Sequence, residues 1–270
     1  MGVLSRALPL AAAVLALAAP AAGAVVYPDS MAATGASATR AAGTCERATG
    51  GCPENSWATG TNAEVNSIYL RIRALHPEIT GNVYNDAVGG EAMSDLADQF
   101  EVVIGQRVQF VIVDMGGNDV CAPEERQVTT VASFRADFEA AMSRLLAARP
   151  ATRIAVASIS NLYRLWEILH TNRAATDSWT RHGTCPSMLA NPTSRSREDE
   201  ERRIRVRERE VELNGVLATV CARHANCEYD RGTAFEHRFE AGDVGRDWFH
   251  PSLAGQATAA AVEWEVPWMF

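Results

Sequence analysis

Short apolar runs alternate with longer segments of helical character along most of the chain. The runs 108–115 and 153–159 are apolar at nearly every position, which is typical of strands buried on both faces of a sheet. Shorter β-prone runs at 25–27, 83–85 and 227–229 predict three further strands. The intervening segments favour helices, through apolar spacing or high charge, over these ranges: 62–75, 92–100, 131–148, 196–224 and 253–264.

This alternation predicts a three-layer α/β domain with a mainly parallel sheet. We expect the Arg- and Glu-rich segment 196–224 to be a solvated helix with i,i+4 ion pairs rather than a binding surface. The Gly-, Ala-, Thr- and Ser-rich segment 32–60 predicts loop, and the aromatic segment 161–192 predicts a lid or a pocket wall. No repeat or linker divides the 270 residues, so a single domain is expected.

The first 24 residues have the composition of a secretory signal peptide. Arg6 supplies a positive start, residues 7–19 form an apolar core, and Ala22-Gly23-Ala24 fits the small-residue rule for cleavage. An uncleaved membrane anchor is the alternative, but the apolar run is short for a bilayer span. We therefore expect a secreted mature chain of residues 25–270, without stable membrane insertion.

The six cysteines favour disulfide bonds, because an even number in an exported chain is typical of such bridges. Sequence alone leaves the connectivity open, but two close pairs suggest this set: Cys45–Cys52, Cys121–Cys185 and Cys221–Cys227. A zinc site is the competing interpretation, with ligands from Cys221-x-x-His224-x-x-Cys227 and His182-x-x-Cys185. An oxidising compartment favours the bridges.

Charge and composition exclude several classes of function. The formal net charge of −8 disfavours nucleic acids and anionic membrane surfaces as partners. The chain contains no lysine, which removes Walker-type phosphate loops, Schiff-base chemistry and Ser-Lys dyads. It also lacks the His-Glu-x-x-His motif of zinc proteases and the Gly-x-Ser-x-Gly elbow of ordinary α/β-hydrolases.

Polar residues and glycines follow three of the expected strands, where ligands bind in an open α/β sheet. A loop near the C-terminus adds a carboxylate and an imidazole, which gives four blocks: Asp29-Ser30, Gly89-Gly90, Gly117-Asn118-Asp119 and Asp247-Trp248-Phe249-His250. A serine hydroxyl becomes a nucleophile when a histidine takes its proton, and a carboxylate orients that histidine. Backbone N–H groups and an asparagine amide can stabilise the resulting oxyanion.

In this order, the four blocks resemble the SGNH, or GDSL-type, hydrolase family across essentially the whole mature chain. Pro28-Asp29-Ser30-Met31 corresponds to the family's Gly-Asp-Ser-Leu, with Pro28 in place of the glycine. The resemblance implies a flavodoxin-like five-stranded sheet and a secreted serine esterase or lipase without metal or cofactor. It implies that Ser30 is the nucleophile and that the Asp247 and His250 pair acts as its base. It also implies an oxyanion hole from the N–H groups of Ser30 and Gly90 and the amide of Asn118.

Two questions stay open at the level of the sequence. Each block alone is explained by a helix cap or a turn, and Pro28, which fixes φ and lacks an N–H, supports a non-catalytic secreted glycan-binding module on the same fold. Substrates within the family range from lipids to acetylated sugars and small esters. Four aromatic residues favour a partly apolar pocket, unless they are core: Trp57, Tyr163, Trp166 and Trp248. We expect a monomer acting on a small-molecule or lipid ester.

Overall fold

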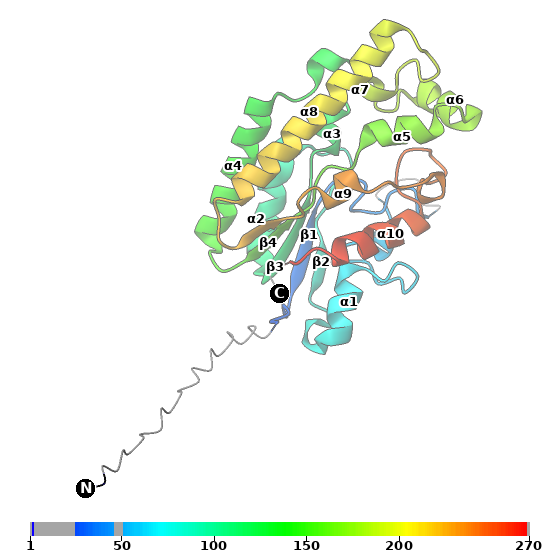
Figure 1. Ribbon diagram of the computed structural model, residues 1–270. Helices are drawn as coiled ribbons and strands as arrows, with labels where there is room; N and C mark the ends of the chain where they lie inside the picture. The colour runs from blue at the N-terminus through cyan, green and yellow to red at the C-terminus, as the bar shows by residue number, and fades with distance from the viewer. Residues whose placement is uncertain (1, 3–24, 46–50, 269–270) are drawn as a thin grey trace.

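A five-stranded parallel sheet forms the centre of the computed structural model, which describes residue 2 and residues 25–45 and 51–268 (Figure 1). The strands lie in the order β2-β1-β3-β4-β5, and every neighbouring pair is parallel. This arrangement confirms the predicted α/β class and the flavodoxin-like sheet. The strand bounds are β1 Met31–Gly35, β2 Val83–Asn85, β3 Phe110–Asp114, β4 Arg153–Val156 and β5 Cys227–Tyr229.

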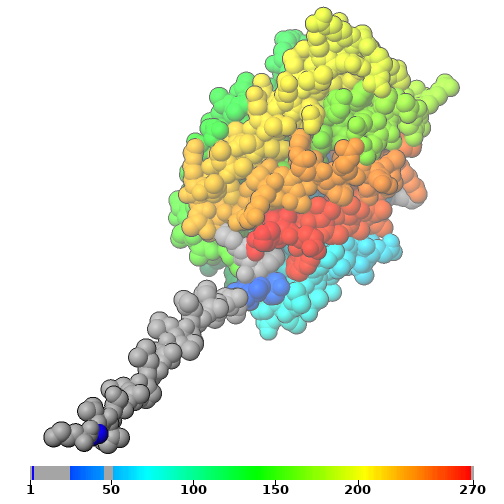
Figure 2. All heavy atoms as spheres, viewed as in Figure 1, coloured from blue at the N-terminus to red at the C-terminus, as the bar shows by residue number. Residues whose placement is uncertain are grey.

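Helices cover both faces of the sheet, so alternate residues of a strand face different layers. In β3, Val111 and Val113 belong to a buried cluster with α2, α4 and α8, whereas Phe110 and Ile112 pack with α1 and α10. Figure 2 shows α10 (red) lying between α1 (cyan) and the segment around α9 (orange). The helices are α1 Ile68–Leu75, α2 Leu96–Gln106, α3 Gly117–Val120, α4 Val131–Ala148, α5 Leu162–Leu169, α6 Arg173–His182, α7 Pro186–Leu189, α8 Arg197–Cys221, α9 Thr233–Glu236 and α10 Leu253–Trp264. Single 3-10 turns occupy Pro53–Asn55, Pro77–Ile79, Met93–Asp95, Glu125–Gln127 and Ala241–Asp243.

The first strand lies later in the chain than its sequence indicates. Residues 25–27 are not in a strand, and β1 is formed by Met31–Gly35, inside the segment predicted as loop. All five of its residues are buried, and they pair with both β2 and β3. Because strand preference depends on pairing and burial more than on the residue types themselves, the small residues of this segment form the strand between β2 and β3.

The other expected elements are present, and local caps set their ends. The structure reproduces the expected ranges of β2, β5, α4 and α10. Helix α1 begins six residues later than the predicted position 62, because the Ser67 hydroxyl accepts the N–H of Leu70 at 3.1 Å and caps it there. Helix α2 continues beyond the predicted end at 100 to Gln106, and Arg107 ends it in the left-handed conformation with φ 60°.

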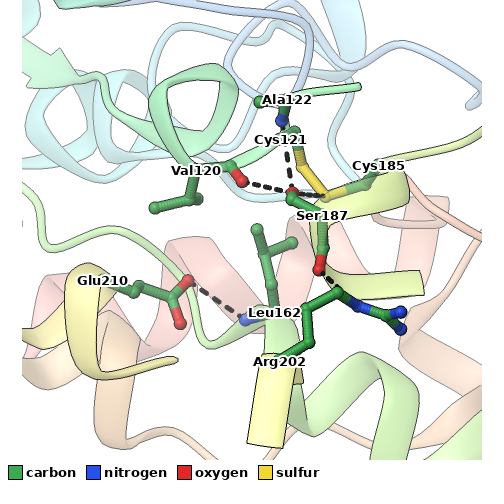
Figure 3. The surroundings of a disulfide bond; sticks show 8 residues. All are labelled: Val120, Cys121, Ala122, Leu162, Cys185, Ser187, Arg202 and Glu210. Carbon is green, nitrogen blue, oxygen red and sulfur yellow. Dashed lines mark hydrogen bonds between the residues drawn. A yellow bond between two sulfur atoms is a disulfide. The ribbon is translucent and has the colours of Figure 1, made fainter. Parts of the chain in front are cut away.

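Helix α8 differs from the predicted solvated helix, because several of its charged residues are buried. Ion pairs at i,i+3 and i,i+4 do line its exposed side, as between Arg197 and Glu201. Arg203, however, is fully buried, with its guanidinium 4.2 Å from the ring centroid of Trp166. Glu210 is also buried, and its carboxyl accepts the N–H of Leu162 at the start of α5 (Figure 3). The charged helix therefore holds α5 in place.

All three predicted disulfides are present: Cys45–Cys52, Cys121–Cys185 and Cys221–Cys227. The zinc interpretation is therefore wrong, because its cysteine sulfurs are joined in pairs. Cys121–Cys185 links the end of α3 to the start of α7, and beside it the Ser187 hydroxyl donates to Val120 O at 2.6 Å and accepts the N–H of Ala122 (Figure 3).

The predicted signal peptide, residues 1–24, lies outside the described residues apart from residue 2. In the part of the chain that the structure describes, no helix has both the length and the apolar character needed to cross a bilayer.

Candidate active site

A sharp turn at the carboxyl end of β1 presents the hydroxyl of Ser37. Gly35, the last residue of the strand, has φ 153°, and a Cβ there would lie 2.5 Å from Asp114 O, so only glycine fits. The Gln99 side chain, from α2, binds both backbone polar groups of Gly35. Its Oε1 accepts the Gly35 N–H at 2.8 Å, and its Nε2 donates to Gly35 O at 2.9 Å. The turn that carries Ser37 is therefore fixed by α2.

A chain of hydrogen bonds joins Ser37 to a histidine and a carboxylate. His250 Nε2 lies 2.8 Å from Ser37 Oγ, and His250 Nδ1 lies 2.6 Å from Asp247 Oδ2. The second oxygen of Asp247 accepts the N–H groups of Phe249 and His250, both at 3.0 Å. Burial opposes ionisation of Asp247, but the hydrogen bonds and charge of His250 and the two backbone N–H groups outweigh it and lower the pKa of this carboxyl. The arrangement is able to remove a proton from the serine hydroxyl.

An asparagine and a glycine-containing loop lie near this serine. Asn118, in α3 after β3, lines the same cavity as Ser37, and one hydrogen of its amide is donated to Glu91 O at 2.7 Å. The loop after β2 is tied to the turn through the N–H of Val88, which donates to Gly35 O at 3.0 Å. In this loop a Cβ on Gly89 would be 3.8 Å from the Cβ of Ser37, and a Cβ on Gly90 would have no neighbour within 4 Å, so open space lies beside the backbone of Gly90.

A cavity of about 200 Å³ opens next to Ser37 and His250. The carboxyl ends of β1, β3 and β4 form its floor, and α5, α9 and α10 supply its walls. Asn161, Leu162 and Leu165 line it, so the start of the segment 161–192 is a pocket wall, as predicted. Among the described residues, no group of three or more His, Cys, Asp or Glu side chains has the arrangement of a metal site.

Comparison with known families identifies the chain. The model of the GDSL-like lipase/acylhydrolase family matches residues 29–258. The chain belongs to the GDSL-like lipase/acylhydrolase family. At the level of the family it is therefore an ester hydrolase. No curated protein sequence matches it at a significant level.

Solved structures similar to this GDSL-like hydrolase share its fold at low sequence identity. An α/β hydrolase enzyme, LAE5, from the metagenome of Lake Arreo in Spain is 16% identical, with TM-score 0.54, over 86% of this chain and 92% of its own. The acetyl xylan esterase AlAXEase is 14% identical, with TM-score 0.53, over 88% and 99%. An extracellular lipase from Streptomyces rimosus is 17% identical, with TM-score 0.51, over 88% and 99%.

The prediction that places Ser30 at the active site of this GDSL-like hydrolase is wrong in its geometry. Ser30 precedes β1, at the opposite end of the strand from Ser37, and its hydroxyl accepts the N–H of Gln109 at 3.1 Å. The neighbouring Asp29 carboxylate is bound by His76 Nε2 at 2.7 Å and by Gln109 Nε2. Asp29 and Ser30 therefore fasten the amino ends of strands and take no part in the His250 site.

A weaker signal in the sequence marks the serine that the structure brings to His250. Gly35-Ala36-Ser37 follows the short run 31–34 and keeps the glycine and serine of the family's Gly-Asp-Ser pattern, with Ala36 in place of the aspartate. The oxyanion role of Gly90, in the loop after β2, stays a prediction. Of the four aromatic residues expected at the pocket, Trp57 lines the cavity, whereas three do not: Tyr163, Trp166 and Trp248.

The loop that carries Asp247 and His250 is anchored by a buried tryptophan of α6. Trp248 has φ 64°, an unfavourable conformation for a bulky residue, and its carbonyl accepts the indole N–H of Trp179 at 2.8 Å. We expect Trp179→Phe to lower kcat about tenfold with little change in KM, because the loop loses this anchor while substrate contacts stay. Steady-state kinetics on a soluble ester measure the two constants. Trp166→Phe, which removes a similar bond from an indole to Pro192 O, is the control and should keep kcat.

The carboxyl next to Asn118 predicts a pH-dependent stability. Burial raises the pKa of Asp119 to about 6, and its Oδ2 accepts the Met93 N–H at 2.9 Å. A raised pKa means that the folded state favours the protonated acid, so the stabilisation that protonated Asp119 contributes is fully present below about pH 4 and is lost as the pH rises to about 6. Asp119→Asn keeps an acceptor and removes the charge. Urea unfolding at pH 4 and pH 7 measures the free energy of unfolding of both proteins. The difference between the variant and the wild type should shift by up to about 3 kcal/mol in favour of the variant from pH 4 to pH 7. An unchanged difference would contradict the assignment.

Proposed function

We propose that the chain hydrolyses carboxylic esters through an acyl intermediate on Ser37. The observation that carries this proposal is the hydrogen-bonded series from Ser37 Oγ through His250 to Asp247. Ser37 and His250 of this series line a cavity that Asn118 also lines. The membership of the GDSL-like lipase/acylhydrolase family supports the same reaction.

In the first half of the reaction, Ser37 Oγ attacks the ester carbonyl carbon while its proton passes to His250 Nε2. Asp247 keeps the imidazole oriented and stabilises the imidazolium. The oxyanion accepts hydrogen bonds from the N–H groups of Ser37 and Gly90 and from the Asn118 amide. When the tetrahedral intermediate collapses, the ester C–O bond breaks, and the leaving alcohol takes the proton from His250.

In the second half, water gives a proton to His250 and attacks the acyl carbon. The acid product leaves, and Ser37 Oγ recovers its proton. The reaction needs no metal or cofactor in this proposal, because the serine, the imidazole and the oxyanion donors supply every step.

The alternative of a non-catalytic glycan-binding module loses its support. It depended on Pro28, which precedes β1 at the end away from Ser37 and does not line the cavity. We further propose that the chain is exported and acts as a monomer; the three disulfides support export.

Labelling with a fluorophosphonate probe tests the proposal. Such a probe phosphonylates a serine that a neighbouring base activates, so we expect one label per chain, on the peptide that contains Ser37. Fragmentation of the labelled peptide in the mass spectrometer shows whether the label is on Ser37 or on Ser30. A folded protein that takes no label, or a label on Ser30, would contradict the assignment. Turnover of p-nitrophenyl esters from acetate to palmitate then separates a short-chain esterase from a lipase.

A further inference from the structure

The side chain of Gln99 connects the turn that carries Ser37 to the loop after β2. The residue is 4% exposed, and its oxygen and both of its amide hydrogens have partners. The oxygen and one amide hydrogen bind the backbone of Gly35, two residues before Ser37. The second amide hydrogen is donated to the carboxyl group of Glu91 at 2.5 Å. Only one orientation of this amide satisfies all three partners, because the backbone N–H donates and the two oxygens accept.

Glu91 in turn fixes the direction of the Asn118 amide. Its backbone carbonyl accepts one amide hydrogen of Asn118 at 2.7 Å, so the position of Glu91 sets the plane of that amide and the direction of its second N–H. Two residues later, the Met93 N–H is donated to Asp119 Oδ2 at 2.9 Å. The end of this loop and α3 are therefore joined by two hydrogen bonds, and a shift of Glu91 shifts the Asn118 amide with it.

The backbone of this loop holds Glu91 less firmly than the side-chain contact does. The N–H of Val88 donates to Gly35 O at 3.0 Å, which fastens the start of the loop. Two glycines follow, and Gly90 has φ 88°, a conformation that glycine adopts freely. One bond closes the turn, with 3.3 Å between Glu91 N and Val88 O. The contact from Gln99 to the Glu91 carboxyl group therefore ties the far side of the loop to the turn that carries the nucleophile.

We propose that Gln99 is a positioning residue, which sets the distance between Ser37 and the oxyanion donors through its contact with Glu91. Donors stabilise an oxyanion most when they already point at the place that it will occupy. The N–H of Ser37 belongs to the turn that Gln99 binds. The Gly90 N–H and the Asn118 amide move with Glu91. This inference rests on the proposed ester hydrolysis, and Gln99 itself does not line the cavity.

The variant Gln99→Glu tests this role. It keeps the size of the side chain and the oxygen that accepts the Gly35 N–H, but it replaces the donor to Glu91 with a second carboxyl group, so that hydrogen bond is lost. We expect kcat for p-nitrophenyl acetate to fall at least about tenfold while KM stays within about twofold, because oxyanion donors act on the transition state rather than on bound substrate. A wild-type kcat in this variant would overturn the proposal.

The matched control is Gln109→Glu. The Gln109 amide makes the same two kinds of contact, because its Oε1 accepts the Asp29 N–H and its Nε2 donates to the Asp29 carboxyl group, both at 2.9 Å. These contacts lie at the amino end of β1, away from Ser37, so this variant should keep kcat within about twofold of the wild type. Melting temperatures show that both variants are folded. An equal loss of kcat in the two variants would overturn the proposal.

Exchange of the two side chains separates the contact itself from general damage. In the double variant Gln99→Glu/Glu91→Gln, the amide at position 91 is able to donate to the carboxyl group at position 99, so the hydrogen bond returns with donor and acceptor reversed. We expect kcat to recover to within about threefold of the wild type. A folded double variant without this recovery would overturn the proposal.

A second variant, Glu91→Ala, keeps the test decisive if Gln99→Glu does not fold. It removes the same contact from the partly exposed side and leaves the backbone carbonyl that Asn118 binds. We expect kcat to fall at least about fivefold with little change in KM. An unchanged kcat in Glu91→Ala would overturn the proposal as well.

Combination with Asn118→Ala tests the link between Gln99 and the oxyanion hole. If Gln99 acts in part through Asn118, the loss of kcat in the double variant should be smaller than the product of the two single losses. Losses that multiply would overturn the proposed path through Asn118. A wild-type chain that hydrolyses no p-nitrophenyl ester would contradict the proposed hydrolysis itself, whereas turnover that Gln99→Glu leaves unchanged would contradict only the role of Gln99.

Discussion

Ser37→Ala is expected to lower kcat for ester hydrolysis by at least about 10³-fold, because the acyl group then has no oxygen to bind. The hydroxyl of Ser37 bonds to His250 Nε2 at 2.8 Å, and no other serine of the described chain has such a contact with this imidazole. Steady-state turnover of p-nitrophenyl acetate measures the loss, and the melting temperature checks that the variant is folded.

Ser30→Ala is the matched control for this experiment. It removes only the acceptor of the Gln109 N–H, so it should cost about 1 kcal/mol of stability and leave kcat within twofold of the wild type. If the Ser37 variant keeps a tenth of the wild-type rate while the Ser30 variant loses most of it, the nucleophile is Ser30 after all.

Replacing His250 with alanine should be nearly as damaging, because no other described group contacts Ser37 Oγ to take its proton. We expect a loss in kcat of about 10³-fold or more on the same ester. His76→Ala provides the control, since His76 also pairs with a carboxylate, Asp29 at 2.7 Å, but at the far end of β1. Activity in the His250 variant that approaches the wild-type value would exclude the proposed triad.

The sequence predicts the fold wherever a segment's own pattern decides its structure. The continuous apolar runs predict β3 and β4 as strands, and the amphipathic pattern predicts α4 as a helix. Long hydrophobic patterns of this kind are compatible with few alternative structures. β1 fails this test, since four of the five residues of Met31–Gly35 are small, and the segment pairs as a strand because β2 and β3 flank it. Because the sequence pattern places β1 too early in the chain, it also indicates the wrong strand end for the nucleophile, at Ser30 instead of Ser37.

The same distinction holds for the candidate site. Asp247 and His250 are three residues apart in one loop, so their pairing is a local property that the sequence displays. Ser37 lacks the adjacent aspartate that made Ser30 conspicuous, so its sequence signal, Gly35-Ala36-Ser37, is weak, and the position of Ser37 beside His250 identifies it. The burial of Glu263, which lines the cavity, is harder still to predict, because Glu263 belongs to an ordinary helical pattern, and its position near Asp114 and Asp230 is a property of the assembled fold.

The helices α5 to α7, which begin at the cavity wall, are fastened to the active site from two sides. Cys121–Cys185 joins them to the segment that follows Asn118, and the Trp179 indole joins them to the loop of His250. Helices linked in this way do not move as a lid without disturbing the catalytic groups. We therefore expect the entrance to the cavity to be open in aqueous solution, without contact with a lipid surface. The enzyme should therefore show no interfacial activation: its rate should follow the concentration of dissolved ester smoothly, with no jump when the ester begins to form micelles.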